Sequence, residues 1–554
     1  MVKGNRFVSL QYFLGLVGMV AVITCTPKLN SVSAGKEKTP FLWSNSTIYF
    51  LLTDRFFNAD VTNDYKPEVI PAPLRGFHGG DIKGITKKIK TGYFTKLGVD
   101  VIWMTPLTEN ISGYVDEGTG VSFGFHGYWT KDWTSIDNRL GSSSDIREMV
   151  KTAHENGIKI MMDVVINHTG PVTPLDPLWP KEWVRTTPRC VYKDYTSTIS
   201  CTLVDNLPDI LTESTSEVKV PDHIQQKWKE EGRFEEEMFS LDMFFKRTGY
   251  PKLPYYYIIK WIVDLIEEFG IDGFRVDTVK HVEEFIWKAL KKEAKIAFER
   301  AKKKFPGELD KDADFYMLGE VYGYNANNGK IYDFPDKKVD YFSNGFDGLI
   351  NFGFTNDAHL SYKDLFAKYA GLKSGSLKDV DVIHYISSHD DGNPFDKKRE
   401  KILESGTKLL LTPGVAQIYY GDEVARPLTA QANGDAVLRT AFDWKSLEEN
   451  DKMICLDHWQ KLGQFRKNNL AVGAGSHVEI AGNIFGRVYK KGKINNKVVF
   501  GIDLPKGEKK IPVGGLFKEG DILYDYYSKG KVRVEEGMVK MNNPFSLVLL
   551  AKSE

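Results

Sequence analysis

The sequence predicts a (β/α)8 barrel, the TIM barrel architecture, with an inserted subdomain after its third strand and a C-terminal antiparallel β-sandwich domain. Eight short apolar runs alternate with amphipathic helical segments over most of the 554 residues, which is typical of parallel βαβ units. Polar residues follow several of these runs, at the strand ends where such a barrel carries its active site. Beyond residue 471, apolar and polar residues alternate between glycine, asparagine and lysine turns, which favours a separate antiparallel domain.

The first 40 residues are typical of an export and attachment segment. Lys3 and Arg6 precede an apolar stretch from 7 to 23 that is short and glycine-rich for a membrane span, so residues 1–24 are expected to be a signal peptide. Cys25 follows directly, as at the acylation site of a bacterial lipoprotein, and residues 25–40 would be a tether. We expect an exported lipoprotein anchored to a bacterial membrane or cell surface. Because residues 22–24 are not the commonest residues before such a cysteine, the alternative is a secreted or periplasmic protein.

The apolar runs give the barrel strands in chain order. The helix predicted around 255–269 shows the alternation, because Ile258, Ile262 and Phe269 share one face and the next run begins at 271. Residues 169–252 break the rhythm and are rich in proline, threonine and charge, so we expect the inserted domain there, the barrel at 41–168 and 253–470, and the C-terminal domain at 471–554. The eight predicted strands lie within residues 46–54, 97–107, 157–168, 271–281, 315–322, 346–354, 382–391 and 414–423.

The composition excludes some partners. The 74 basic residues balance the 74 acidic ones, so no net charge draws the chain to nucleic acid, and we expect membrane contact only through Cys25. We expect a monomer. Export permits disulfides, and a bond between Cys190 and Cys201 would close a short loop with a stabilisation of about 2–3 kcal/mol. Cys455 lies in a helical stretch and is expected to be a buried free thiol.

Three carboxylates are expected to meet at the barrel mouth. Asp277 comes two residues after Arg275 at the end of the fourth strand, Glu320 ends the fifth, and Asp390 follows the seventh. The separations of 43 and 70 residues match one and two βα units. Such a group suggests glycoside chemistry, in which one carboxylate attacks the sugar carbon and a protonated one releases the leaving oxygen. Each has a structural alternative, such as an ion pair of Asp277 with Arg275, but three such roles on these strand ends would be a coincidence.

A loop after the first strand concentrates oxygen-bearing side chains. Calcium takes six to eight oxygen ligands, so this composition suits a calcium site, and a polar turn is the alternative. The candidate ligands are Asn58, Asp60, Asn63, Asp64 and Asp81.

These residues lie in motifs that resemble the α-amylase family of glycoside hydrolases across nearly all of residues 46–550. DVVINH (163–168), GFRVDTVKH (273–281), GEV (319–321) and SHD (388–390) resemble the motifs of the third, fourth, fifth and seventh strands. NLPDI (206–210), HGYWTKD (126–132) and YYGDE (419–423) resemble the motifs of the inserted domain, the sugar-stacking segment and the eighth strand. One departure is Ser388, where family members commonly have asparagine.

The resemblance implies a role for each matching residue. Asp277 would be the nucleophile, Glu320 the general acid/base and Asp390 the third carboxylate of a retaining mechanism. The side chains implied to line the substrate site are Tyr128, His126, His168, Arg275, Lys280, His281 and His389.

The resemblance also implies Ca2+ as a cofactor. Asn167, Asp209 and the backbone of His281 match a structural calcium site that joins the barrel to the inserted domain. The loop that begins at Asn58 resembles a second calcium site found in some members.

The neighbouring pair Lys280 and His281 bears on the kind of reaction. It resembles members that bind glucose units beyond the cleaved bond, such as endo-acting amylases and cyclodextrin-forming transglycosylases. Transglycosylases of that kind resemble one another in being longer chains that carry added starch-binding domains. We therefore expect hydrolysis of internal α-1,4 bonds in starch, glycogen or maltooligosaccharides. The alternatives are a maltogenic, cyclodextrin-cleaving or transglycosylating relative and, with less support because the three carboxylates are intact, a non-catalytic surface starch-binding protein.

Overall fold

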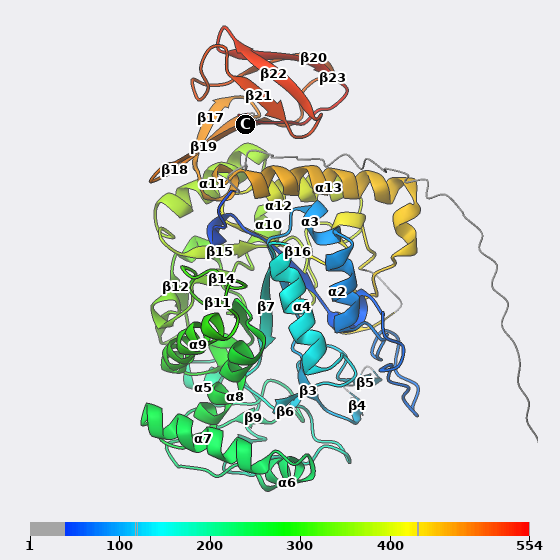
Figure 1. Ribbon diagram of the computed structural model, residues 1–554, viewed down its shortest axis with the longest axis vertical. Coiled ribbons are helices and arrows are strands. Elements are labelled where there is room, and N and C mark those ends of the chain that lie inside the picture. Colours follow the sequence, from blue (N-terminus) through cyan, green and yellow to red (C-terminus); the bar gives the residue numbers. More distant parts are fainter. Residues whose placement is uncertain (1–38, 117, 119, 429–431, 553–554) are drawn as a thin grey trace, which may run out of the picture. The chain divides into compact units, whose positions relative to one another are not determined.

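Eight parallel strands close into a barrel in the computed structural model, which describes residues 39–116, 118, 120–428 and 432–552 (Figure 1). Each strand pairs with the next along the chain, and the last pairs with the first. The predicted (β/α)8 fold is therefore confirmed, and each predicted run matches one strand, although β15 begins one residue before its run. The strands are β1 (Thr47–Leu51), β2 (Val101–Met104), β7 (Lys159–Val164), β10 (Gly273–Val276), β11 (Tyr316–Gly319), β14 (Gly348–Ile350), β15 (Asp381–His384) and β16 (Val415–Tyr419).

Helices surround these strands (Figure 1). Their ends follow local sequence signals: Ser142 and Asp145 form a capping box at the start of α4, and Gly270 ends α8 with a φ of 75°, a value that glycine adopts without a Cβ penalty. The helices outside the inserted segment are α1 (Thr53–Phe56), α2 (Ile82–Lys90), α3 (Tyr93–Leu97), α4 (Ser143–Glu155), α8 (Pro254–Phe269), α9 (Glu284–Lys304), α10 (Phe354–Asp357), α11 (Tyr362–Ser374), α12 (Ile402–Leu411), α13 (Asn450–Asn468) and α14 (Ala471–Ala474).

The segment between β7 and α8 contains three helices and two short paired strands. A disulfide joins Cys190 to Cys201, and a bridge between His168 and Asp209 ties the segment to the end of β7. Cys455 is a free thiol, as expected, but it is half-buried rather than buried. The elements of the segment are β8 (Val184–Arg185), α5 (Thr196–Ile199), β9 (Asp209–Ile210), α6 (Asp222–Glu230) and α7 (Phe234–Thr248).

Three hairpins extend from the loops of the barrel. Two of them follow β2 and one follows β11. Their strands are β3 (Thr108–Asn110) with β6 (Thr130–Ile136), β4 (Tyr114–Asp116) with β5 (Val121–Phe123), and β12 (Ile331–Asp333) with β13 (Lys338–Asp340).

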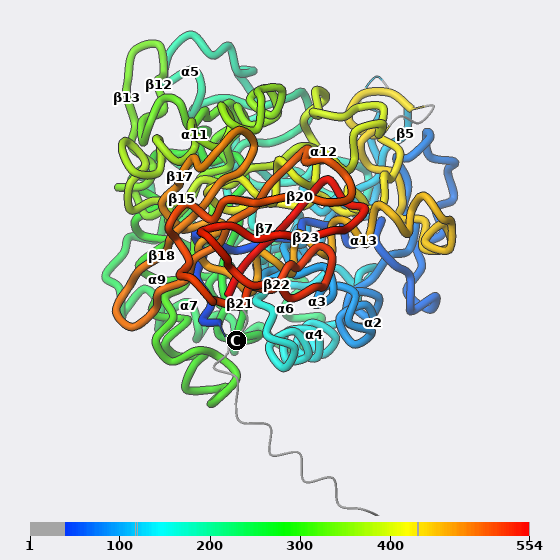
Figure 2. The backbone as a smooth tube through the Cα atoms, turned by 90° about the horizontal axis from the view of Figure 1, so that it is seen from above, coloured from blue at the N-terminus to red at the C-terminus, as the bar shows by residue number. Residues whose placement is uncertain are grey.

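The C-terminal strands form an antiparallel sheet with the order β17-β18-β19-β24-β21-β22-β23-β20 around its own apolar cluster. Figure 2 shows these orange and red strands lying over the barrel. Phe366 of α11 contacts Phe485 and Phe500 of the sheet, with ring centroids 5.3 and 5.8 Å apart. The strands are β17 (Ser476–Ala481), β18 (Ile484–Lys491), β19 (Ile494–Gly501), β20 (Gly507–Pro512), β21 (Ile522–Asp525), β22 (Gly530–Glu535), β23 (Met538–Asn543) and β24 (Val548–Lys552).

One buried arginine closes the amino-terminal end of the barrel. Arg466 of α13 donates to the carbonyls of Asn45, Leu410 and Thr412, at 3.0, 2.9 and 3.2 Å, and to that of Gly414. These carbonyls precede β1 and β16, so hydrogen bonds from Arg466 hold α13 against the amino ends of these two strands. The opposite, carboxyl end is left for the loops that carry the predicted site.

The expected signal peptide (1–24), Cys25 and residues 26–38 of the tether lie outside the described residues. Of the helices in the part of the chain that is described, none combines the length and apolar character needed to cross a bilayer.

The packing of α13 against α3 gives a test of the fold. A Cβ at Gly463 would lie 1.9 Å from the carbonyl oxygen of Leu97, so we expect Gly463→Ala to lower the free energy of unfolding by about 1–3 kcal/mol. Gly371→Ala is the matched control, because Gly371 lies inside α11 with open space around its Cβ position, and alanine there is expected to stabilise the protein by up to about 1 kcal/mol. Denaturant unfolding of both variants measures the difference, and equal stabilities would contradict the packing.

Candidate active site

The centre of the site is the guanidinium of Arg275, which is 1% exposed. The register of β10 with β7 places Arg275 beside Asp163, and its Nη1 lies 3.0 Å from Asp163 Oδ1. The same Nη1 lies 2.6 Å from Asp277 Oδ1, and Nη2 lies 3.3 Å from Glu320 Oε2. One buried cation therefore holds three carboxylates from three neighbouring strands, including two of the three predicted catalytic residues.

Asp163 is surrounded by hydrogen-bond donors. Besides Arg275, the indole of Trp103 donates to its Oδ2 at 3.1 Å and the hydroxyl of Tyr128 donates to the same oxygen at 2.7 Å. Burial raises the pKa of Asp163 to about 7 in spite of the opposing charge of Arg275. Asp163 thus orients Arg275 and Tyr128. It lies within its strand, whereas Asp277 and Glu320 follow the carboxyl ends of theirs.

Glu320 is positioned by the backbone after β10. The N–H of Thr278 donates to Glu320 Oε2 at 2.8 Å, and Thr278 adopts a φ of 50° that turns the chain there. Burial raises the pKa of Glu320 above its usual range; Arg275 opposes this shift, while the charges of Asp277 and Asp390 add to it. Glu320 therefore retains a proton near neutral pH.

Asp390 lies at the rim, with its side chain 35% exposed, and two partners hold it. Nε2 of His389 is 2.9 Å from one carboxylate oxygen and Nη2 of Arg439 is 2.7 Å from the other. Partial burial acts to raise the pKa of Asp390, but these two partners outweigh it and keep that pKa well below its usual range. Burial lowers the pKa of His389, and the neighbouring Asp390 opposes that shift.

Aromatic and imidazole rings form one wall of the site. The Tyr128 ring stacks with those of His389 and His126, at centroid distances of 5.4 and 5.8 Å. His168 Nε2 is 3.2 Å from the carbonyl oxygen of Tyr128, and burial lowers the pKa values of His168 and His126. The structure thus gathers three of the predicted histidines around Tyr128, whose ring centroid also lies 5.7 Å from the Arg275 guanidinium.

Lys280 lies beside Glu320 in a group of tyrosines. Its ammonium donates to the carbonyl of Tyr322 at 3.1 Å and lies 5.6, 5.3 and 5.8 Å from the ring centroids of Tyr192, Tyr322 and Tyr332. Burial lowers the pKa of Lys280. Tyr192 and Tyr322 are about half exposed, at 49% and 50%, so neither ring is part of the core.

The first predicted calcium site contains unpaired buried oxygens. Asn167 and Asp209 are each 1% exposed, and among the described residues Oδ1 of either side chain has no hydrogen-bond partner. The backbone N–H of Ile210 donates to the carbonyl of Asn167 at 2.8 Å, so the two residues are adjacent. His281 Nδ1 is 2.9 Å from the carbonyl oxygen of Thr198 in the inserted segment. This set of oxygen ligands fits a hard cation.

The second predicted calcium site is only partly assembled. Asn58 donates to Asp64 at 2.7 Å, the Oδ1 atoms of Asn58 and Asn63 are buried without a partner among the described residues, and a Cβ on Gly79 would meet both Asn58 and Asp64. Two other candidates face protein donors instead. Asp60 pairs with Lys83 at 2.5 Å, and Asp81 accepts from the N–H groups of Ala59, Asp60 and Gly84 as the N-cap of α2. No group of three or more His, Cys, Asp or Glu side chains that could hold a metal occurs within the described residues.

Several residues of the site have no strong signal in the sequence. Trp103 looks like an ordinary strand residue, and Arg439, which also pairs with Asp435 at 2.5 Å, comes from a loop after β16. Glu283 is buried with both carboxylate oxygens unpaired among the described residues, and its charge acts on Asp209. The i, i+4 spacing of Asp435 and Arg439 is the one sequence feature that could have indicated a paired arginine there.

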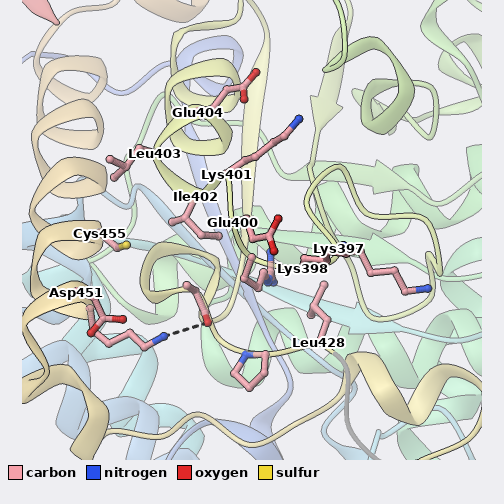
Figure 3. Close-up of a pocket in the computed structure, with 14 residues that line it drawn as sticks. Lys397, Lys398, Glu400, Lys401, Ile402, Leu403, Glu404, Leu428, Asp451 and Cys455 are labelled. Atoms are coloured by element: carbon pink, nitrogen blue, oxygen red, sulfur yellow. Dashed lines mark hydrogen bonds between the residues drawn. The ribbon is translucent and has the colours of Figure 1, made fainter. Parts of the chain in front are cut away.

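A separate hollow of about 740 Å3 lies near the start of α12 (Figure 3). Side chains of both charges line it, among them Lys397, Lys401, Glu404 and Asp451. Its described lining residues do not include Asp277, Glu320 or Asp390, so it is distinct from the carboxylate site.

Comparison with known proteins identifies the family. The model of the α-amylase catalytic domain matches residues 50–461, which is more than half of the chain and includes all three carboxylates. The chain belongs to the α-amylase family. It is therefore an enzyme of the glycoside hydrolase class that acts on α-glucans, by hydrolysis or by transglycosylation.

Relatives within the α-amylase family include both kinds of enzyme. A periplasmic α-amylase of Escherichia coli strain K12 is 32% identical over 508 residues, covering 80% of this chain and 69% of the relative. A cyclomaltodextrin glucanotransferase of Thermoanaerobacterium thermosulfurigenes is 24% identical, covering 96% of this chain and 72% of the relative.

Solved structures share the fold. An α-amylase from Geobacillus thermoleovorans in complex with acarbose has a TM-score of 0.65 at 22% identity, over 93% of this chain and all of that chain. A cyclomaltodextrin glucanotransferase described as having a three-domain ABC distribution has a TM-score of 0.62 at 19% identity, over 92% and 99%. Chain length is therefore no argument against transglycosylation, contrary to the expectation from sequence.

Proposed function

We propose that the protein hydrolyses internal α-1,4-glucosidic bonds of starch, glycogen or maltooligosaccharides with retention of configuration. The observation that carries the proposal is the contact of Asp277 and Glu320 with the two Nη atoms of one guanidinium. That shared contact holds the two carboxyl groups on one side chain, which supports a retaining mechanism, because direct attack by one of the two requires them to lie close together.

Asp277 is the proposed nucleophile. Its carboxylate is held 2.6 Å from Arg275 Nη1 and can attack the anomeric carbon to form a glycosyl-enzyme ester. Glu320 is the proposed general acid/base: its raised pKa keeps the proton that the leaving oxygen takes, and the resulting carboxylate then accepts a proton from the attacking water.

The remaining residues bind the sugar. Asp390, held as an anion by Arg439, is placed to accept hydrogen bonds from sugar hydroxyls and to favour positive charge at the anomeric carbon. Tyr128 offers its ring as a stacking surface, with His126, His168 and His389 around it.

Product analysis tests the mechanism. We expect the wild-type protein to lower the iodine staining of starch and to release products that are initially α-anomers, as seen by NMR. Asp277→Asn is expected to reduce kcat by at least about 10⁴-fold, because it removes the nucleophile. Initial β-anomers, or unchanged activity in Asp277→Asn, would contradict the assignment.

The pH profile tests the role of Glu320. The charge of Asp390 helps to raise the pKa of Glu320, so Asp390→Asn should lower that pKa and move the alkaline limb of kcat/KM to lower pH, besides reducing kcat by about 10²–10⁴-fold. Asp391→Asn is the matched control: Asp391 accepts from the Tyr385 hydroxyl at 2.9 Å, and its neutralisation should leave the alkaline limb in place. An unmoved limb in Asp390→Asn would rule out this coupling.

Transglycosylation is the second candidate. The transferase relatives and the tyrosines around Lys280 favour it, because a well-bound acceptor sugar competes with water for the glycosyl-enzyme. A maltogenic or cyclodextrin-cleaving activity is a further alternative. A purely starch-binding role is disfavoured by the presence of all three carboxylates.

Calcium is the proposed cofactor, held by Asn167, Asp209 and the backbone of His281. The proposed second site is formed by Asn58, Asp60, Asn63, Asp64 and Asp81. When bound, the ion would supply the positive charge that joins the inserted segment to the barrel. The unpaired Oδ1 atoms of Asn167 and Asp209 support this role.

Chelation tests the cofactor. EDTA is expected to lower the Tm of the wild-type protein by about 5–10 °C, and excess Ca2+ should restore it, because an ion that binds only the folded state stabilises it. In Asp209→Asn the EDTA effect should shrink, while Asp64→Asn reports on the second loop alone. A wild-type Tm that does not respond to EDTA would exclude both sites.

We further propose the domain limits and location expected from sequence: barrel residues 41–168 and 253–470, an inserted domain at 169–252, a C-terminal domain at 471–554, and export of a monomeric protein with Cys25 as a lipid attachment site. The periplasmic relative supports export.

A further inference from the structure

The loop closed by Cys190 and Cys201 borders the site on the side of Lys280. The carbonyl of Thr198 lies 2.9 Å from His281 Nδ1, which joins one end of the loop to the turn after β10. Tyr192, near the other end, lies 5.9 Å from the His281 ring and 5.6 Å from the Lys280 ammonium, measured to ring centroids. The disulfide closes the loop on itself, so other contacts must fix its position on the barrel.

Tyr195 makes those contacts. Its backbone N–H donates to Asp336 Oδ1 at 2.7 Å, and its hydroxyl donates to the carboxylate of Glu284. The Lys337 ammonium lies 3.7 Å from the centroid of the Tyr195 ring, and Phe334 meets the ring edge-on at 5.1 Å. A single side chain thus contacts both the hairpin of β12 and β13 and the first residue of α9.

Glu284 completes this attachment. Lys337 donates to Glu284 Oε1 at 2.6 Å, while the Tyr195 hydroxyl occupies the other oxygen. Tyr195, Glu284 and Lys337 therefore form a closed group in which each member contacts the other two. Groups of this kind hold three chain segments in one arrangement at less entropic cost than isolated surface pairs.

The same hairpin reaches Lys280. Tyr332 of β12 accepts a hydrogen bond from Lys280 Nζ at 3.4 Å and donates to the carbonyl of Tyr322 at 3.3 Å. Lys280 thus lies between a tyrosine of the disulfide loop, Tyr192, and a tyrosine of the hairpin, Tyr332, and the group around Tyr195 sets the position of both.

We propose that Tyr195 is a positioning residue that fastens the disulfide loop to the β12–β13 hairpin and so holds Tyr192 and Tyr332 around Lys280, where glucose units beyond the cleaved bond bind. This inference rests on the proposed function. It assigns to Tyr195 an effect on the preference for long over short leaving groups and on the capture of an acceptor sugar, without contact with the reacting atoms.

Two substrates separate this role from a general structural one. Maltoheptaose extends beyond the cleaved bond, whereas an aryl α-maltoside carries only an aryl leaving group. For Tyr195→Ala we expect KM for maltoheptaose to rise about 5- to 30-fold and kcat/KM for the aryl maltoside to change less than about 2-fold. The share of transfer to added maltose should fall. Tyr195→Phe, which loses only the bond to Glu284, should show a smaller effect in the same direction.

Controls make each outcome decisive. Tyr489→Ala, a matched substitution in β18 of the C-terminal sheet, should leave both substrates unaffected. If Tyr195→Ala does not fold, Asp336→Asn and Lys337→Gln should each raise KM for maltoheptaose by a smaller factor and leave kcat/KM for the aryl maltoside nearly unchanged. Equal losses of kcat/KM on both substrates, or unchanged kinetic constants on both, would overturn the proposal. A wild-type protein that cleaves neither substrate would instead overturn the proposed function.

Discussion

The site depends on one buried cation that has more carboxylate partners than it can neutralise. Arg275 contacts Asp163, Asp277 and Glu320 in a region removed from water, where an uncompensated charge is costly. Burial is the main cause of the raised pKa values of Glu320 and Asp163; the charge of Asp277 adds to both shifts, and Arg275 opposes them. A carboxylate of Asp277 held by Arg275, beside a Glu320 that keeps its proton, is the pair that a retaining glycosidase needs.

The barrel register is what brings these groups together. Arg275 pairs with Asp163 across β10 and β7, and Val276 pairs with Gly319 across β10 and β11, so Asp277 and Glu320 emerge one residue beyond neighbouring strand ends. Gly319 belongs to this geometry, because a Cβ there would lie 2.8 Å from Leu349 of β14. Closure of the barrel at its other end by Arg466 leaves the carboxyl ends free for the loops.

Much of this could be predicted from sequence because it depends on local pattern. Apolar runs gave the strands, and the polar residues after them gave the mouth, since parallel strands all end on one face. The loops could not be predicted in the same way. Arg439 reaches Asp390 from a loop 49 residues further along the chain, and Tyr195 contacts Glu284 and Asp336 across 89 and 141 residues. Such contacts exist only in the folded chain.

Composition does not show which partners a side chain meets. Asp60 lies among the oxygen-bearing residues predicted to bind calcium, and in the fold its carboxylate also pairs with Lys83 on α2. Cys455 was expected in the core, and the helix that carries it turns this position partly outward. The partner of Asp60 lies on a different helix, and the exposure of Cys455 depends on how its own helix is oriented. Composition contains neither kind of information.

The central claim is that Asp277 becomes covalently linked to the sugar. A maltosyl fluoride, offered to Glu320→Gln so that the departing fluoride needs no acid and the second step lacks its base, tests it by mass spectrometry. We expect the intact mass to increase by one maltosyl unit and peptide mapping to place the sugar on Asp277. Turnover of the fluoride without any adduct, or an adduct on another residue, would contradict the claim.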